Sequence, residues 1–318
     1  RKRIVFIVDE CHRSVFGDMM HDVKRTFPNA VFFGFSGTPI FDGAKKMSDT
    51  SDVFGNELHR YTIADGIRDR NVLGFDPYMV MTYPDKDIRT VIALEKAKAQ
   101  SIEEALATPE KSKVFYHWMD ASLVPMAGTY APDGSYSKGI EDYLPAVQYQ
   151  SDTHIDAVVR DIVANFTILS HGGKFHSIFA TSSIPEALVY YRRFKKDAPH
   201  LKVTALFDPS IDNTGEGQLA KEDGLVELIT DYNARYGREF RIQSFALMKK
   251  DIAARLAHKE PYQYSAREPE QQIDILIVVD QMLTGYDSKW INTLYMDKVL
   301  RGANIIQAFS RTNRLFGP

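Results

Sequence analysis

The stretch Ile4–Val8, which reads IVFIV, is an unbroken apolar run rich in β-branched residues. Such a run predicts a strand buried on both faces of a parallel sheet. Asp9, Glu10, Cys11 and His12 follow it directly.

Open α/β sheets bind ligands at the carboxyl ends of their strands, and buried carboxylates need a partner. A hydrated magnesium ion that carries a nucleotide phosphate is one such partner. Asp9 would then hold the metal, and Glu10 would orient or deprotonate the attacking water. The alternative is a strand end with two solvated acids.

A second apolar run follows the first after a helical interval. Met20 to Asn29 leads into Ala30 to Phe35, and Ser36, Gly37, Thr38 and Pro39 come next. Strand, helix, strand and a hydroxyl-rich turn together predict a βαβ unit of a parallel α/β fold. Ser36 and Thr38 would then lie beside the first carboxylates and could relay the state of a bound nucleotide. They could equally be turn formers before a proline.

Composition and length limit the classes of protein to consider. The 318 residues suit two domains rather than one core. No apolar run is long enough to span a bilayer, and the start has no signal-peptide pattern. The only cysteine is Cys11, so no internal disulfide is possible and a reducing cytoplasm is the expected location. A net charge of −3 leaves any contact with DNA to local patches, hydroxyl groups and helix N-termini.

The hydrophobic patterns predict three consecutive parts. Residues 1–83 would form the second half of a first α/β domain, with a helix over 54–71 and a strand over 74–83 that leaves it. Residues 84–150 would be a mainly helical insertion, with helices over 91–106 and 113–124. Residues 151–318 would form a second α/β domain. Its predicted helices cover 152–170, 184–196, 219–236 and 245–258, and its predicted strands cover 174–181, 201–207 and 273–279.

The turn after the strand over 174–181 is a candidate phosphate site. Thr181 and Ser182 end the strand, and a helix is predicted to begin at Ile184. Small hydroxyl residues before a helix N-terminus suit the binding of a phosphate. The alternative is an ordinary capped helix after a strand.

Four short motifs, in this order along the chain, resemble motifs of superfamily 2 helicases and translocases. DECH at 9–12 and SGTP at 36–39 resemble motifs II and III, and TGYD at 284–287 and QAFSRTNR at 307–314 resemble motifs V and VI. The longer stretches over 54–75, 274–298 and 304–316 resemble the motor (R) subunit of type I restriction-modification enzymes. Four ordered motifs are a specific signal, whereas any one alone is weak.

The resemblance implies two RecA-like parallel-sheet lobes with helical insertions, the first lobe being incomplete. It implies ATP and Mg²⁺ as cofactors, with ATP hydrolysed between the lobes. Asp9 and Glu10 would be the acids of motif II, and Arg311 and Arg314 would reach the γ-phosphate from the second lobe. Residues three apart on a helix share a face, so Arg311 and Arg314 are predicted to lie on one helix and to point into one cleft. The remaining implied ATP-binding or coupling residues are His12, Ser36, Gly37, Thr38, Gly285, Asp287 and Gln307, and those implied for DNA are Thr181, Ser182 and Thr284.

The resemblance has gaps as well. Many relatives have arginine where this chain has Ala308 and glycine where it has Ser310. No G-x-x-x-x-G-K-[ST] pattern, which cradles nucleotide phosphates, occurs in the sequence. The nuclease motif of type I motor subunits is also not found. We therefore expect the chain to be a fragment that neither turns over ATP nor cuts DNA by itself.

The resemblance implies double-stranded DNA and the modification (methyltransferase) and specificity subunits as partners, with no membrane. The leading hypothesis is a segment of an ATP-driven duplex DNA translocase of a type I restriction endonuclease. One alternative is another superfamily 2 remodeller or helicase, such as a type III restriction subunit. Another is a non-catalytic nucleic-acid-binding scaffold with a decayed nucleotide site. A magnesium phosphohydrolase built on Asp9 and Glu10 alone would leave Arg311 and Arg314 unexplained.

Overall fold

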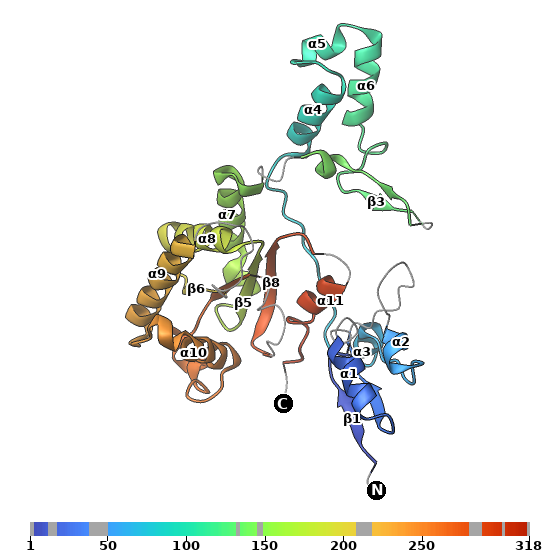
Figure 1. The fold of residues 1–318 in the computed structure, drawn as a ribbon. Helices are drawn as coiled ribbons and strands as arrows, with labels where there is room; N and C mark the ends of the chain where they lie inside the picture. The colour runs from blue at the N-terminus through green and yellow to red at the C-terminus, as the bar shows by residue number, and fades with distance from the viewer. Residues whose placement is uncertain are drawn as a thin grey trace.

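The structure is a computed structural model that describes residues 3–11, 18–37, 50–131, 134–144, 149–207, 218–279, 288–300 and 303–316. His12, Thr38, Thr284, Gly285 and Asp287 lie outside these ranges. The described chain mixes helices with parallel sheets, and this confirms the predicted α/β class. Figure 1 shows an N-terminal module, a helical module and a larger α/β module around a four-stranded sheet.

The N-terminal module contains a short parallel sheet. Strand β1 (Val5–Val8) pairs in parallel with β2 (Val31–Gly34), and helix α1 (Asp18–Thr26) connects them, so the predicted strand–helix–strand unit is confirmed. Burial of β1 on both faces is not observed, because Val5 is 53% exposed and Ile7 is 72% exposed. Among the described residues only β2 pairs with β1, and full burial of a parallel strand needs neighbours on both edges and layers on both faces.

The range 54–71, predicted as one helix, is helical only at Phe54 and over 63–68. Helix α2 (Thr50–Phe54) ends at Gly55, whose φ of 86° lies in the left-handed region. Helix α3 (Ile63–Arg68) begins at a capping box, in which the Thr62 hydroxyl accepts from Asp65 N–H and Asp65 accepts from Thr62 N–H. Local side-chain bonds of this kind favour a new helix start over a continuous helix.

The prediction of a strand over 74–83 is wrong. This segment, which we call the connector, is extended but pairs with no strand among the described residues. Pro77 has no N–H to donate to a ladder, and Tyr78 and Met79 are 81% and 90% exposed. The connector nevertheless contacts the C-terminal part of the chain, because the ring centroids of Phe75 and Phe309 are 5.4 Å apart. Just before the connector, Leu73 N–H donates to Asn313 O at 2.8 Å.

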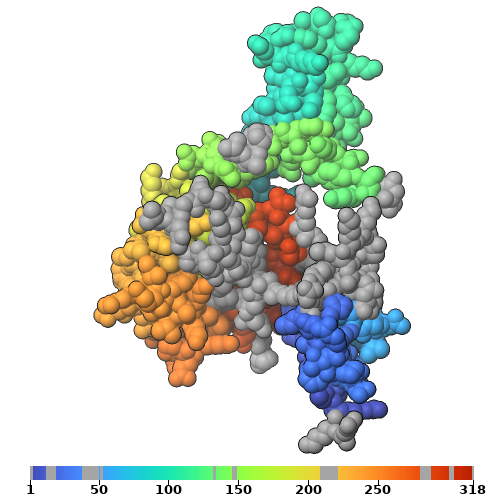
Figure 2. Space-filling model, in the orientation of Figure 1, coloured from blue at the N-terminus to red at the C-terminus, as the bar shows by residue number. Residues whose placement is uncertain are grey.

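The helical module follows the connector and projects away from the four-stranded sheet (Figures 1 and 2). The helix predicted over 91–106 divides at Lys98, which has a left-handed φ of 51°, and restarts where the Ser101 hydroxyl accepts from Glu104 N–H. The module also contains a hairpin and a 3-10 turn. Its elements are α4 (Asp85–Lys96), α5 (Ile102–Leu106), α6 (Pro109–Met119), β3 (Thr129–Tyr130), β4 (Tyr136–Ser137) and η2 (Ile140–Tyr143).

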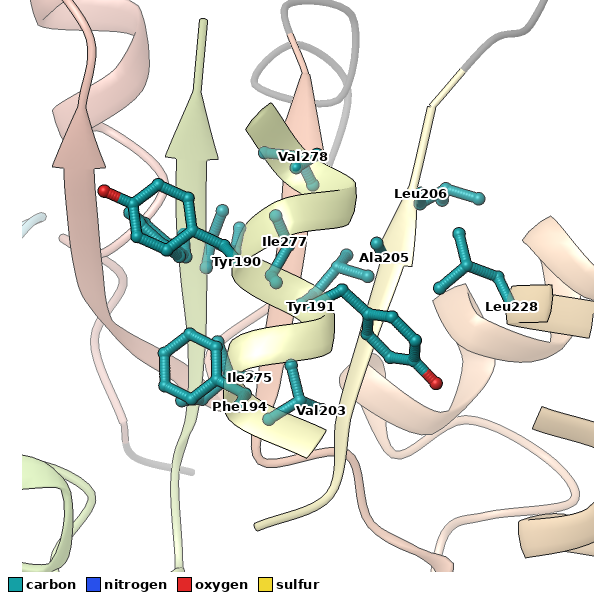
Figure 3. Packing of buried hydrophobic residues seen from close by; sticks show 14 of the residues in the cluster. Tyr190, Tyr191, Phe194, Val203, Ala205, Leu206, Leu228, Ile275, Ile277 and Val278 are labelled. Atoms are coloured by element: carbon teal, nitrogen blue, oxygen red, sulfur yellow. The ribbon is translucent and has the colours of Figure 1, made fainter. Parts of the chain in front are cut away.

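The C-terminal α/β module holds most of the buried core. Its parallel sheet has the order β6-β7-β5-β8. Tyr190 and Phe194 of α8 are fully buried against this sheet, and Figure 3 shows α8 lying over the strands. The predicted helices and strands of this module are confirmed within a few residues; β8 was not predicted. Its main elements are α7 (Asp152–Leu169), β5 (His176–Thr181), α8 (Ile184–Asp197), β6 (Val203–Leu206), α9 (Gln218–Tyr236), α10 (Phe245–Ala257), β7 (Ile275–Val279), β8 (Ile291–Asp297) and α11 (Ala303–Phe309).

Candidate nucleotide and DNA sites

The two acids of the first motif form a strained turn at the carboxyl end of β1. Glu10 has a φ of 48°, in the left-handed region, and its N–H donates to Asp9 Oδ1 at 2.9 Å. Both residues are exposed. A left-handed glutamate costs on the order of 1 kcal/mol, and such strain is concentrated at functional sites. The turn therefore presents both acids to solvent at the sheet edge where α/β proteins bind ligands.

Backbone hydrogen bonds hold this turn against the second predicted motif. Cys11 N–H donates to Phe35 O at 2.9 Å, and Phe35 N–H donates to Val8 O at 2.8 Å. Ser36 and Gly37 follow directly, so the structure brings the acids and this loop together, as predicted from the βαβ pattern.

Cys11 fills the space under the turn rather than facing solvent. It is 1% exposed, and a Cβ on Gly34 would lie 2.8 Å from its Sγ. Burial raises the pKa of the Cys11 thiol, so the neutral form packs there as a small apolar group. Gly34 is required at this position because a larger residue would displace the thiol.

The acids are suited to a hydrated magnesium ion. Magnesium is usually held by one or two carboxylates together with phosphate oxygens and water, and Asp9 and Glu10 supply the carboxylates on an exposed turn. Larger clusters of His, Cys, Asp or Glu able to hold a metal do not occur within the described ranges. When bound, Mg²⁺ would neutralise phosphate charge, and Asp9 would hold it.

The arginines of the last motif do not lie on a helix, which corrects the sequence prediction. Helix α11 ends at Phe309, before Arg311 and Arg314. The Ser310 hydroxyl donates to Gln307 O at 2.8 Å and the Thr312 hydroxyl donates to Phe309 O at 3.1 Å. These side-chain bonds compete with the helical pattern, so a shared helical face does not align the two arginines.

The turn after β5 is positioned by its neighbours in the sheet. Thr181 is fully buried and its hydroxyl donates to Val278 O at 3.2 Å, so its side chain supports the sheet edge. Ser182 is exposed; its N–H donates to Glu186 Oε2 at 3.1 Å and its hydroxyl donates to Asp297 O at 3.4 Å. Ser183 caps α8 by accepting from Glu186 N–H. Ser182 is therefore the hydroxyl of this turn that remains accessible.

A buried polar cluster beside this turn was missed by the sequence analysis. Asp297, the last residue of β8, accepts from Tyr190 OH at 2.5 Å and from His154 Nε2 at 3.0 Å. Burial and the charge of Asp297 raise the pKa of Glu186 to about 7. Burial opposes ionisation of Asp297, but the bonds from His154 and Tyr190 outweigh it and lower its pKa. The available signal was the carboxylate that directly follows the apolar stretch of β8.

Comparisons with known proteins agree with this fold. The family model for the SWI2/SNF2 ATPase matches residues 1–112, and the model for type I restriction enzyme subunit R domain 3 matches residues 173–318. A type I restriction enzyme endonuclease subunit of Staphylococcus aureus (strain MRSA252) is 33% identical over 98% of this chain and 29% of its own length. One of Staphylococcus saprophyticus is 34% identical over 98% of the chain and 29% of its own length. A putative one of Methanocaldococcus jannaschii is 26% identical over 99% of the chain and 26% of its own length.

The chain thus has the parallel α/β architecture of the RecA-like ATPases, with helical insertions. It belongs to the family of type I restriction enzyme R (endonuclease) subunits. The chain spans about 29% of the length of the Staphylococcus relatives it matches. Within the described residues, no helix has the length and apolar character needed to cross a membrane.

Proposed function

We propose that this chain forms part of the ATP-driven motor of a type I restriction endonuclease subunit, and that the whole subunit moves double-stranded DNA as it hydrolyses ATP. The observation that carries the proposal is the Asp9–Glu10 turn, held beside Ser36 and Gly37 at the carboxyl end of a parallel strand. In phosphoryl transfer a protein mainly positions groups and neutralises charge. A metal-holding acid next to a water-orienting acid supplies two of the groups that this chemistry needs.

In this mechanism Asp9 would hold Mg²⁺, and Glu10 would orient the water that attacks the γ-phosphate. Arg311 and Arg314, supplied by the C-terminal module, neutralise charge on that phosphate. The hydrogen bond from Leu73 N–H to Asn313 O supports this role, because it fixes the arginine segment relative to the segment that leaves the N-terminal module. Binding of the nucleotide and its coupling to DNA are assigned, from the resemblance of their motifs, to His12, Ser36, Gly37, Thr38, Gly285, Asp287 and Gln307.

On the DNA side, Ser182 and Thr284 are proposed to contact the phosphate backbone, with Thr181 buried beneath the Ser182 turn. Hydroxyls and backbone N–H groups position a protein on DNA without reading its sequence. Sequence recognition is therefore left to a specificity subunit, and the modification (methyltransferase) subunit is the other proposed partner. The division into parts at 1–83, 84–150 and 151–318 belongs to the same proposal, with ATP bound between the first and third parts.

The experiment uses the parent full-length chain, mixed with its modification and specificity subunits. ATP hydrolysis is measured with and without unmethylated duplex DNA. We expect DNA to stimulate hydrolysis, and Glu10→Gln and Arg314→Ala to lower the stimulated rate at least about a hundredfold, as removal of one transition-state group does. Glu57→Gln is the matched control, since Glu57 is an exposed acid of the same module that pairs with Arg60 at 2.6 Å.

The outcomes separate the competing functions. Stimulated hydrolysis that survives Glu10→Gln would contradict the proposed mechanism. DNA binding without any hydrolysis would favour the scaffold. Hydrolysis stimulated equally without the partner subunits would favour another superfamily 2 remodeller or helicase.

A further inference from the structure

Asp297 occupies the point where the four-stranded sheet meets the Ser182 turn. The register of β5 with β8 places Asp297 opposite Thr181, the residue before Ser182. The backbone oxygen of Asp297 accepts the Ser182 hydroxyl at 3.4 Å. A change in the end of β8 therefore moves the acceptor of that hydroxyl directly.

The side chain of Asp297 is fixed from three sides. Tyr190 of α8 is fully buried and donates its hydroxyl, and His154 of α7 is 4% exposed and donates from Nε2. Glu186 is hydrogen-bonded to the Asp297 carboxylate and also accepts Ser182 N–H at 3.1 Å. The carboxylate itself is only 18% exposed, so solvent screens these bonds weakly.

The other nitrogen of His154 extends the network to the connector. Nδ1 of His154 lies 2.8 Å from the Thr82 hydroxyl oxygen. The ring of the next connector residue, Tyr83, stacks on the His154 ring, with ring centroids 6.3 Å apart. The Tyr83 hydroxyl also shares a hydrogen bond of 2.6 Å with the Ser151 hydroxyl. A continuous set of contacts thus runs from the connector through His154 and Asp297 to Ser182.

The rest of the connector has few such contacts. Tyr78, Met79 and Met81 are each more than three-quarters exposed. Besides the Phe75 ring on Phe309, Thr82 and Tyr83 therefore fix the connector to the C-terminal module. They contact His154, whose other ring nitrogen bonds Asp297. Apolar side chains in place of the Thr82–His154–Asp297 hydrogen bonds would stabilise a core equally well, so stability alone does not explain these polar contacts.

We propose that Asp297 is a positioning residue: it orients the Ser182 turn toward the DNA backbone and couples that turn, through His154, to the connector at Thr82. This inference rests on the proposed DNA-dependent motor function. It names the residues that link DNA contact at Ser182 to the connector. Asp297 touches neither the nucleotide nor the DNA in this role; it acts through Ser182.

The test uses the full-length subunit with its modification and specificity subunits, and measures ATP hydrolysis against the concentration of unmethylated duplex. Asp297→Asn keeps the shape but removes the charge that two donors share. We expect the DNA concentration for half-maximal stimulation to rise about tenfold, the typical effect of losing one charge-assisted hydrogen bond. Hydrolysis without DNA should change less than about twofold. A purely structural role would lower the melting temperature and leave the half-maximal DNA concentration unchanged.

Two further variants keep the test decisive if Asp297→Asn folds poorly. Thr82→Val removes only the connector hydroxyl, and should raise the half-maximal DNA concentration by about threefold. Because both changes act on one network, the double variant should need no higher DNA concentration for half-maximal stimulation than Asp297→Asn alone. Asp231→Asn is the matched control: Asp231 also accepts a tyrosine hydroxyl, from Tyr191 at 2.7 Å, but lies on α9. We expect it to leave the DNA response unchanged.

The results distinguish this inference from the function on which it rests. If the wild type is stimulated by DNA and both Asp297→Asn and Thr82→Val respond as it does, the positioning role is overturned while the motor stands. If the wild type shows no DNA-stimulated hydrolysis, the motor proposal fails and this inference fails with it.

Discussion

The backbone N–H of Leu73 donates a hydrogen bond of 2.8 Å to the carbonyl oxygen of Asn313. Asn313 is 2% exposed and stands between Arg311 and Arg314, whereas Leu73 begins the segment that leaves the N-terminal module. Two segments about 240 residues apart in sequence are therefore joined at the place where the proposed ATP chemistry needs both modules. The ring of Phe75 on Phe309 adds an apolar contact beside this bond.

Phe75→Ala should loosen the connector. The lost ring contact is worth on the order of 1–3 kcal/mol for a partly buried aromatic side chain, so the connector should detach more often. We expect chymotrypsin to cleave near the exposed Tyr78 several times faster than in the wild type. Leu58→Ala, which truncates a side chain that is 82% exposed, should leave the cleavage rate unchanged. Equal rates for Phe75→Ala and wild type would show that this contact does not hold the connector.

Asp251→Ala should strongly destabilise the C-terminal module. Arg255 is fully buried, and its Nε donates to Asp251 Oδ2 at 2.9 Å. Removing the acid leaves a buried guanidinium without its counter-charge, which costs about 3–5 kcal/mol. Glu227→Ala breaks the more exposed pair with Arg192 and should cost only about 0–1 kcal/mol. Urea unfolding gives the free energy of unfolding of both variants. Similar decreases for Asp251→Ala and Glu227→Ala would show that the buried Arg255 charge does not depend on Asp251.

Acid should destabilise the fold through two buried histidines. His176 lies against Ile273 O through Nδ1 at 2.6 Å, so that nitrogen carries the proton, and its Nε2 accepts from His258 Nε2 at 2.8 Å. Burial, with a contribution from His258, lowers the pKa of His176 to about 3, and burial lowers the pKa of His258 to about 4. Both rings are neutral in the fold, whereas unfolded histidine titrates near 6.5.

The sign of the effect follows from proton uptake. Between pH 6.5 and about 4 the unfolded chain binds more protons than the folded one, so the free energy of unfolding falls as the pH is lowered through this window. We expect a lower urea midpoint at pH 5 than at pH 7.5. The His258 ring stacks on Trp290, with ring centroids 3.9 Å apart. His258→Phe keeps that ring but removes one titrating group, so the variant should lose less stability on acidification. A midpoint that is equal at both pH values would exclude this account.

Glu186→Gln should stabilise the protein more at pH 8 than at pH 5.5. Burial and Asp297 raise the pKa of Glu186 to about 7, above its unfolded value, so the folded state prefers the neutral acid. The free energy of unfolding therefore falls as the pH rises from the unfolded pKa near 4.3 to about 7, and it is constant above that. Glutamine mimics the neutral form at every pH. The melting temperature of variant and wild type, compared at both pH values, measures this. A difference that does not change with pH would contradict it.

Much of the fold could be predicted from the sequence, and the failures have physical causes. The strands at β5 and β7 and the helix at α7 were predicted because their apolar patterns reflect contacts inside one complete module. The predicted burial of β1 on both faces was wrong, because the strand pairs only with β2 among the described residues. The connector was predicted as a strand from alternation alone, although Pro77 removes a donor.

The candidate site was predictable only where short motifs carry it. Asp9, Glu10 and Ser36 lie together because a βαβ unit places the ends of its strands side by side. The left-handed Glu10 and the end of α11 before Arg311 depend on local hydrogen bonds that no pattern encodes. Asp297 and His154 are 143 residues apart, so their pairing becomes visible only in three dimensions.

The most direct test of the motor is a measurement of movement along DNA. The full-length subunit, assembled with its modification and specificity subunits, is placed on duplexes that carry a labelled third strand at increasing distances from the recognition site. We predict that ATP displaces the third strand after a lag that grows linearly with distance, and that Glu10→Gln abolishes displacement while DNA binding persists. Displacement that does not depend on distance, or that continues in Glu10→Gln, would contradict the account.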